Sequence, residues 1–207
     1  MKMLPGLSDK YHFILASKSP RRQQLLTEAG LIFDVVSIDY EESFPAHLQG
    51  SGIAEYLSRA KALQFRKTDI GPSDILITAD TIVWCSGKVL DKPSDHKEAF
   101  DILSIISGNT HEVITGVTLL SAVSMQTFSE STKVTFDRLT KEEIEFYIEN
   151  YRPFDKAGGY GIQEWIGIIG NSHIDGSYFN VMGLPVNRLL KELRNFIQTT
   201  DKKSIGI

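Results

Sequence analysis

Short apolar runs alternate with amphipathic stretches from one end of the chain to the other, which predicts alternating strands and helices. Runs rich in β-branched and aromatic residues predict strands at 13–17, 31–38, 75–85, 111–123, 133–139 and 165–169. Apolar residues at helical spacing predict helices at 20–29, at 52–66, between Ser94 and Gly108, at 141–150 and at 186–197. We therefore expect a mixed α/β fold, although the pattern does not order its sheet.

Two of the predicted helices carry clear boundary signals. Ser19 is a typical N-cap residue and Pro20 suits the first helical position, while Gly30 is suited to end the same helix. Thr140 and Glu143 have the spacing of a capping box. The second helix is therefore expected to begin at residue 141.

Length and charge restrict the class of protein. With 207 residues, the chain fits one domain, 1–207, built either as a single body or as two lobes. The formal net charge of −4 argues against a general nucleic-acid or membrane binder, which would carry a broad basic surface. No apolar run approaches the roughly 20 residues of a membrane span, and the N-terminus lacks the apolar core of a signal peptide. We expect a soluble, cytoplasmic protein with no nucleic-acid or membrane partner.

The lone cysteine and the C-terminal segment add little chemistry. Cys85 cannot form an intramolecular disulfide, which agrees with a reducing compartment, and no Cys/His spacing around it is typical of a metal site. The tail from about residue 199, "TTDKKSIGI", carries no motif. We expect this tail to be disordered.

Two arginines stand at the start of the first predicted helix, in the stretch "LASKSPRRQQLL". A helix N-terminus is already partly positive, so Arg21 and Arg22 work against the helix unless an anion neutralises them. Guanidinium groups and free first-turn amides both suit phosphate oxygens, and Ser17 could add a hydroxyl. The alternative is that both arginines lie in solvent at small cost. We favour an oxyanion site, because a strand that ends at a helix N-terminus is where α/β proteins bind phosphate.

An aspartate interrupts the apolar strand 75–85. Burying an ionised Asp80 is costly unless a cation meets it, and that cation could be a lysine, an arginine or a metal. Lys92 follows the hairpin predicted at "SGK" and could return towards Asp80, while Lys61 lies on the apolar stripe of the helix 52–66. The alternatives are a bend or bulge where Asp80 bonds to the local backbone, and a Lys61 that reaches to solvent without a function.

A pair of acids, Glu41 and Glu42, follows the strand 31–38 and could offer metal-binding oxygens, or could simply be solvated. Four cations and two carboxylates are then available: Arg21, Arg22, Lys61, Lys92, Asp80 and Glu42. Phosphoryl transfer needs such a set, with cations against the phosphate charge and acids to hold Mg²⁺ and activate water. Spacing alone does not bring these positions together.

Five strings in order resemble the Maf family of nucleoside triphosphate pyrophosphatases: "LASKSPRRQQLL", "TADTIVWCSGKVLDKP", "SGNTHEVITGV", "DKAGGYGIQ" and "GSYFNVMGLPV". The resemblance runs from about Phe13 to Leu193. It implies a two-lobed α/β fold with a central cleft, like that of inosine-triphosphate pyrophosphatases, and a homodimer in many members. It also implies a hydrolase acting on acid anhydrides, which cleaves a nucleoside triphosphate to the monophosphate and pyrophosphate with Mg²⁺ or Mn²⁺.

The resemblance also implies roles for individual residues. The family's catalytic acid falls on Asp80, and its acidic loop matches Glu42, so these two would hold the metal. Its phosphate-binding residues match Ser17, Arg21, Arg22, Lys61 and Lys92. The match at Glu42 is the loosest, because "DYEES" differs from the family's usual context.

The loop "KAGGYGIQ" resembles the branch of the family that prefers dTTP and UTP over 7-methyl-GTP. Specificity positions of that branch match Arg21, Thr81 and Gln163, and a glutamine amide suits the imide edge of thymine or uracil. One departure is Glu164, which stands where the family usually has glycine and is followed by Trp165. Two other readings remain at this stage: a nucleotide-binding regulator of cell division without turnover, and a phosphatase that removes only the terminal phosphate.

Overall fold

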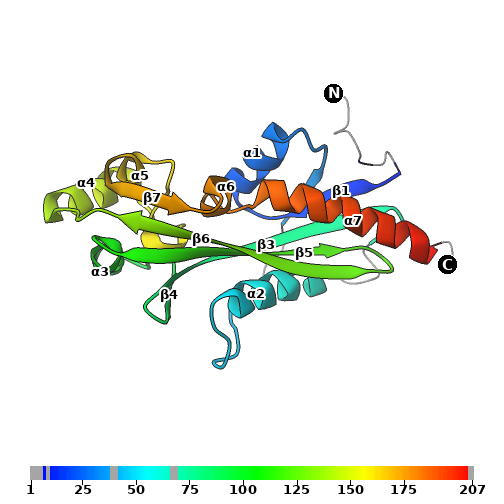
Figure 1. Ribbon diagram of the computed structural model, residues 1–207, viewed down its shortest axis with the longest axis horizontal. Coiled ribbons are helices and arrows are strands. Elements are labelled where there is room, and N and C mark those ends of the chain that lie inside the picture. The colour runs from blue at the N-terminus through cyan, green and yellow to red at the C-terminus, as the bar shows by residue number, and fades with distance from the viewer. Residues whose placement is uncertain (1–6, 8–9, 38–41, 66–69, 205–207) are drawn as a thin grey trace. The chain divides into compact units, whose positions relative to one another are not determined.

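The structure is a computed structural model that describes residues 7, 10–37, 42–65 and 70–204. Its strands are β1 (His12–Ala16), β2 (Asp34–Val36), β3 (Asp74–Cys85), β4 (Lys88–Leu90), β5 (Thr110–Leu120), β6 (Met125–Phe136) and β7 (Asn171–Asp175). Its α-helices are α1 (Pro20–Glu28), α2 (Ser51–Gln64), α3 (His96–Ile106), α4 (Lys141–Tyr151), α5 (Trp165–Gly170), α6 (Tyr178–Val181) and α7 (Val186–Ser204), and a 3₁₀ turn, η1, covers Ala157–Gly159 (Figure 1). The expected mixed α/β class is confirmed.

Hydrogen bonding places the strands in the order β2-β1-β3-β5-β6-β7, and β4 pairs with β3. β1 runs parallel to both of its neighbours, so that Ile14 is level with Asp34 on one side and with Leu76 on the other. β4 returns antiparallel along β3 after the tight turn at Ser86, which confirms the predicted hairpin. A parallel β1–β3 pair requires a long crossover between its strands.

The chain divides into two compact units, which we describe separately. The first unit comprises Met1–Asp80, Thr115–Glu130 and Gly183–Ile207, and the second comprises Thr81–Ile114 and Ser131–Met182. Asp80 and Thr81, neighbours on β3, therefore belong to different units.

In the first unit, α2 lies on one side of the strands, and α1 and α7 lie on the other (Figure 1). One buried cluster joins strand residues to α2 through Ile14, Leu76, Leu120 and Ala62. Burying such aliphatic side chains gives about 1.5–3 kcal/mol each before entropic costs. This packing fixes the strand ends that carry the polar residues described below.

The second unit is built around a larger core of aliphatic and aromatic side chains. Leu103 and Ile106 on α3, Tyr147 on α4, Phe136 on β6 and Ile166 on α5 are all fully buried. The capping box that opens α4 is present as predicted: the Thr140 hydroxyl accepts from the amide of Glu143, and the Glu143 carboxylate accepts from the amide of Thr140.

The strand predicted at 165–169 is wrong, because the segment "WIGIIG" forms helix α5 and the strand, β7, begins only at Asn171. A short apolar run does not distinguish a strand from a buried helical turn. Close packing decides here: a Cβ built at Gly167 would lie 2.0 Å from the carbonyl oxygen of Ile162, so the glycine lets the helix lie against the preceding loop.

The lengths of two elements also differ from expectation. Helix α7 continues to Ser204, so residues 199–204 are helical rather than a disordered tail. Strand β2 is limited to Asp34–Val36, much shorter than the 31–38 expected. Residues 38, 41, 66 and 205–207, on which further expectations fall, lie outside the described residues. Within the described part of the chain, none of the helices combines the length and the apolar character needed to cross a membrane.

Candidate active site

The turn between β1 and α1 is fixed by the backbone around two serines. The buried Ser17 donates its amide to the carbonyl of Val36 at 3.2 Å, and its hydroxyl accepts from the amide of Ser19 at 3.1 Å. Ser19 has the extended backbone of an N-cap residue, as expected, but its side chain forms no capping hydrogen bond. The hydroxyl of Ser19 therefore does not compete with an anion for the first-turn amides of α1.

Arg22 is held by two main-chain carbonyls. Its Nε donates to the oxygen of Gly183 and its Nη1 to the oxygen of Ala79, both at 2.8 Å. Two of the five guanidinium donors thus fix the plane of the side chain directly beside Asp80. The pKa of Arg22 is lowered, mainly by desolvation, and the negative charges of Asp80 and Glu42 oppose this shift. Arg22 is therefore an oriented cation in electrostatic contact with both acids.

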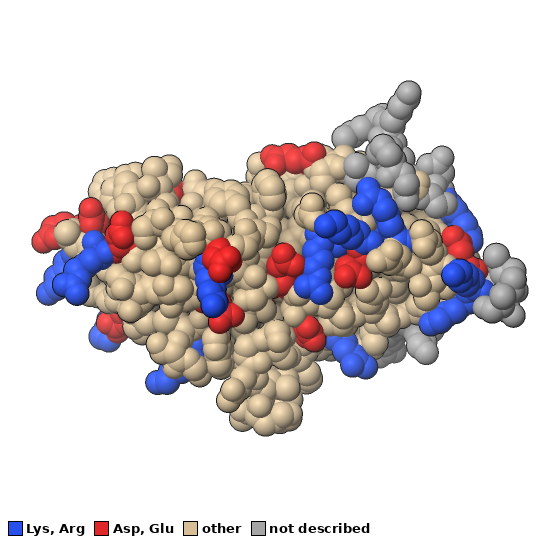
Figure 2. Space-filling model, in the orientation of Figure 1, with Lys and Arg blue, Asp and Glu red and all other residues tan. Residues whose placement is uncertain are grey.

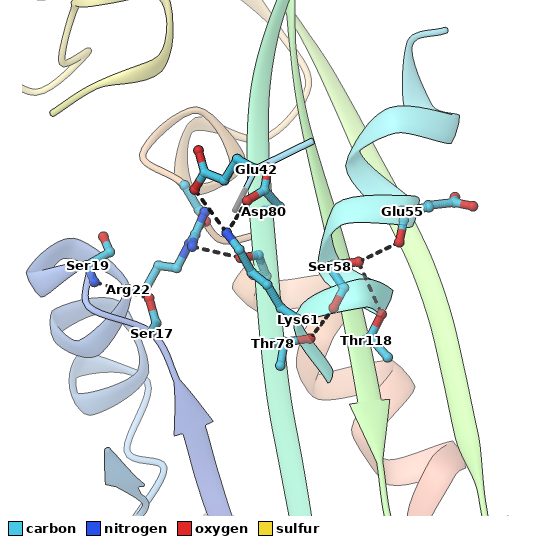
Figure 3. A network of polar contacts seen from close by, with 12 residues as sticks. Ser17, Ser19, Arg22, Glu42, Glu55, Ser58, Lys61, Thr78, Asp80 and Thr118 are labelled. Atoms are coloured by element: carbon cyan, nitrogen blue, oxygen red, sulfur yellow. Dashed lines mark hydrogen bonds and ion pairs between the residues drawn. The ribbon is translucent and has the colours of Figure 1, made fainter. Parts of the chain in front are cut away.

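The buried carboxylate of Asp80 is neutralised by a lysine. The carboxylate pairs with the Nζ of Lys61, and Glu42 Oε1 lies 3.3 Å from the same nitrogen (Figure 3). Asp80 is only 5% exposed, whereas Glu42 is exposed. The prediction that a cation pairs with Asp80 is confirmed. Of the two lysines considered, Lys61 is the ion-pair partner. The alternative in which Asp80 bonds to the local backbone is wrong, because its carboxylate pairs with Lys61 while β3 continues through it.

The position of Lys61 depends on how closely α2 packs on the strands. A Cβ built at Gly116 on β5 would lie 2.1 Å from the carbonyl oxygen of Ala54 on α2, so only glycine permits this approach. Ser58 also connects α2 to two strands. Its carbonyl accepts from the hydroxyl of Thr78 on β3 at 2.7 Å, and its hydroxyl lies 3.1 Å from that of Thr118 on β5 (Figure 3).

These supporting residues were missed at the sequence level. Ser58, Thr78 and Thr118 are each fully buried, and their hydroxyls find partners in one another and in the backbone. Thr78 shares the strand face of Asp80, two residues away, which was the available signal. Nothing in the sequence pairs Gly116 with α2, because that contact joins residues far apart in the chain.

Three residues expected at the site belong to the second unit. Lys92 is exposed in the segment after β4, and Thr81 is partly buried on β3. Gln163 lies between η1 and α5, and its Oε1 is buried without a hydrogen-bond partner in the described structure. That these residues act together with the first unit's charges stays a prediction.

The residues present fit a divalent cation. Asp80 and Glu42 both approach a single ammonium nitrogen, which places two carboxylates around one position of positive charge. Mg²⁺ takes oxygen ligands and is bound by one or two carboxylates together with substrate phosphates and waters. Among the described residues there is no group of three or more His, Cys, Asp or Glu side chains that could hold a metal alone. This donor set therefore fits an ion that arrives with a phosphate ligand, with Asp80 and Glu42 holding it.

Arg22, Lys61 and the buried Asp80 give this α/β protein the kinds of charge that hydrolysis of phosphate anhydrides uses. On the face shown in Figure 2, acidic and basic side chains are interspersed. A nucleic-acid binder would carry a broad basic surface instead. A family model described as "Maf-like protein" matches residues 12–196. The chain belongs to this family.

Curated relatives match over nearly their whole length. A dTTP/UTP pyrophosphatase of Bacteroides thetaiotaomicron is 48% identical over 190 residues, which is 91% of this chain and 98% of that protein. A dTTP/UTP pyrophosphatase of Phocaeicola vulgatus is 50% identical over 193 residues, or 93% of this chain and 99% of the relative. Among solved structures, a HAM1 protein from Coxiella burnetii aligns with a TM-score of 0.42 and 13% identity, over 62% of this chain and 74% of that one.

Proposed function

We propose that this protein is a hydrolase that cleaves dTTP and UTP to the nucleoside monophosphate and pyrophosphate. Curated relatives that share almost half of its residues over 91% or more of the chain carry the name dTTP/UTP pyrophosphatase. The observation that carries the chemistry is the buried Asp80, paired with Lys61 and adjacent to the tethered Arg22. A protein that only binds nucleotide has no use for a desolvated acid facing its phosphate-binding cations unless it binds a metal.

In this proposal the cations hold the triphosphate. Arg21, Arg22 and the start of α1 bind phosphate oxygens, Ser17 contributes its hydroxyl, and Lys61 and Lys92 add charge. Arg22 is already oriented by its two carbonyl partners, so little side-chain entropy is lost when it binds phosphate. Such preorganised contacts stabilise the charge that develops on the leaving pyrophosphate.

Asp80 is the proton acceptor. It takes a proton from the water that attacks the α-phosphorus, the bond between the α-phosphorus and the bridging oxygen breaks, and pyrophosphate leaves. The ammonium of Lys61 balances an ionised Asp80 in its buried position. A bound Mg²⁺ or Mn²⁺ would supply charge neutralisation for the phosphates and a lower pKa for a coordinated water.

Base recognition is assigned to Gln163, with Thr81 and Arg21 as further specificity positions. The buried Oε1 of Gln163 has no partner among the described residues, and leaving an acceptor in that state is costly. The N3–H group of uracil or thymine would donate to it. Cytosine has no hydrogen at that nitrogen, so CTP would leave the acceptor unpaired and be rejected.

The test is a substrate panel with product analysis. The protein with Mg²⁺ or Mn²⁺ is incubated with dTTP, UTP, CTP, methylated pyrimidine triphosphates and 7-methyl-GTP, and nucleotides and phosphates are separated. We expect monophosphate and pyrophosphate from dTTP and UTP. Orthophosphate with a nucleoside diphosphate would mean a terminal phosphatase instead. No turnover of any compound, with binding retained, would mean the regulator of cell division considered as the alternative.

Two further features belong to this proposal. Assembly as a homodimer is expected from the family resemblance, and sedimentation of the purified protein would test it. A reducing, cytoplasmic setting agrees with the single cysteine, Cys85, which is buried.

A further inference from the structure

The loop that carries Gln163 is closed by residues outside the charged site of the first unit. We use the term glycine loop for residues 156–163. Lys156 at its start is buried. Its Nζ donates to Oδ1 of the neighbouring Asp155 at 2.7 Å and also lies 3.4 Å from Oε1 of Glu164, the residue directly after the loop. An ion pair between the two ends of a short segment restricts the conformations between them.

Tyr147 on α4 connects the same carboxylate to the middle of the loop. Its hydroxyl donates to Glu164 Oε2 and accepts from the amide of Gly161 at 3.0 Å. Tyr147 is fully buried, so its hydroxyl depends on these partners. One carboxylate therefore serves both Lys156 and Tyr147, and the tyrosine passes the constraint to the loop backbone.

Packing around Gly161 supports the same arrangement. A Cβ built at Gly161 would lie 2.7 Å from Cδ of Glu164, so the glutamate side chain lies directly against the loop backbone. The side chain forms no capping bond to α5, although Glu164 is the N-cap residue of that helix. Its carboxylate is thus directed to the loop rather than to the helix that it precedes.

We propose that Glu164 is a positioning residue, which with Tyr147 and Lys156 clamps the glycine loop and thereby fixes Gln163 for pyrimidine recognition. The inference rests on the proposed function for the role of Gln163, but the clamp itself is a property of the free protein. Glu164 combines an ion pair to Lys156 with the hydrogen bond from Tyr147, so one carboxylate holds the loop from both sides. A loop held in advance lowers the entropic cost of binding the base.

The experiment uses Tyr147→Phe and Glu164→Gln, with Glu149→Gln on the exposed side of α4 as the matched control. Amide hydrogen exchange at Gly161 is measured by NMR in the free, full-length protein. Loss of one hydrogen bond of about 1 kcal/mol is worth roughly a fivefold faster exchange, which we expect in both variants and not in the control. Unchanged exchange in both variants would overturn the clamp.

Steady-state kinetics with UTP tests the consequence of the clamp for substrate binding. We expect both variants to raise KM roughly fivefold with kcat within twofold of the parent, and the double variant to raise KM no further than the larger single effect, because the two act through one contact. A fall in kcat at unchanged KM would overturn the positioning role. If the parent protein cleaves neither dTTP nor UTP, the proposed function fails, while the exchange at Gly161 still decides whether the clamp exists.

Discussion

One histidine in each unit shows how differently the two regions hold a polar group. In the first unit, His12 lies at the start of β1, half exposed, with Asp34 at 2.8 Å from one ring nitrogen and Asp74 at 3.0 Å from the other. In the second unit, His111 is 2% exposed, with Tyr160 hydroxyl at 2.7 Å and the ring of Phe136 beside it. The carboxylates raise the pKa of His12, whereas burial lowers the pKa of His111 to about 4.

The same contrast holds for the groups to which we assign function. The first unit surrounds its buried acid with cations, so its chemistry depends on net charge at Asp80, Lys61 and Arg22. The second unit buries neutral polar groups, such as Gln163 Oε1 and the ring of His111, in addition to the buried cation Lys156. We therefore expect loss of charge to damage the first unit's function most, whereas the second unit is also sensitive to loss of fit and to a charge gained at a buried neutral group.

The largest effect is expected from Asp80→Asn. The variant keeps the shape of the side chain but removes the proton acceptor. It also removes the negative charge that pairs with the Lys61 ammonium. We expect kcat for UTP to fall about 10³-fold or more, within the range of general acid–base catalysis, while nucleotide binding measured by calorimetry is largely kept. Asp101→Asn, at an exposed position on α3, is the control. Normal turnover in Asp80→Asn would reject the assignment of the base.

Gly116→Ala tests whether the first unit's charges depend on close packing of α2. The added methyl group would meet the carbonyl of Ala54, so the helix must shift, and overpacking of this kind costs about 1–3 kcal/mol or more. We expect a lower free energy of unfolding in urea and a lower kcat/KM, because Lys61 moves with α2. Gly52→Ala on the same helix meets only the Leu48 side chain, at 3.7 Å, and should be neutral or stabilising. Equal stability of the two variants would contradict the argument.

The contrast between these two glycines shows where sequence reasoning ends. Hydrophobic periodicity placed α1, α2, β3 and α4 within a few residues of their observed bounds, because each has a strong local pattern or a boundary signal. A carboxylate within an apolar strand predicted that a cation would meet Asp80. The choice of Lys61 over Lys92 needed the fold, because it depends on how α2 crosses the strands.

Errors arose where tertiary packing overrides local pattern. "WIGIIG" has the composition of a strand, yet it forms α5 because Gly167 allows close contact with Ile162. At Glu164 the sequence alone shows only a departure from the loop pattern of the family that it resembles. Its partners Tyr147 and Lys156 could not be identified before the loop was seen to fold back against α4.

Acidification is expected to destabilise the protein through His111. Because burial lowers its pKa to about 4, the unfolded chain binds a proton near pH 6.5 while the folded chain does not. Stability is thus lost as the pH falls from about 6.5 to 4, by at most about 3 kcal/mol. Urea unfolding of the parent and of His111→Gln across this range measures the effect. The variant should show the shallower pH dependence, and identical slopes would mean that His111 does not carry it.

His12 should give the smallest effect and the opposite sign. Hydrogen bonds to Asp74 and Asp34 raise its folded pKa, so its contribution to stability is fully present below about pH 6.5 and is lost as the pH rises through the folded value. Because the side chains of His12 and Asp34 are 50% and 75% exposed, we expect less than about 1 kcal/mol. The difference in unfolding free energy between the parent and His12→Gln should therefore shrink from pH 6 to pH 9, and should also shrink in high salt. A difference that grows with pH would mean that the two carboxylates do not hold a protonated His12, and the contrast between the two histidines would be lost.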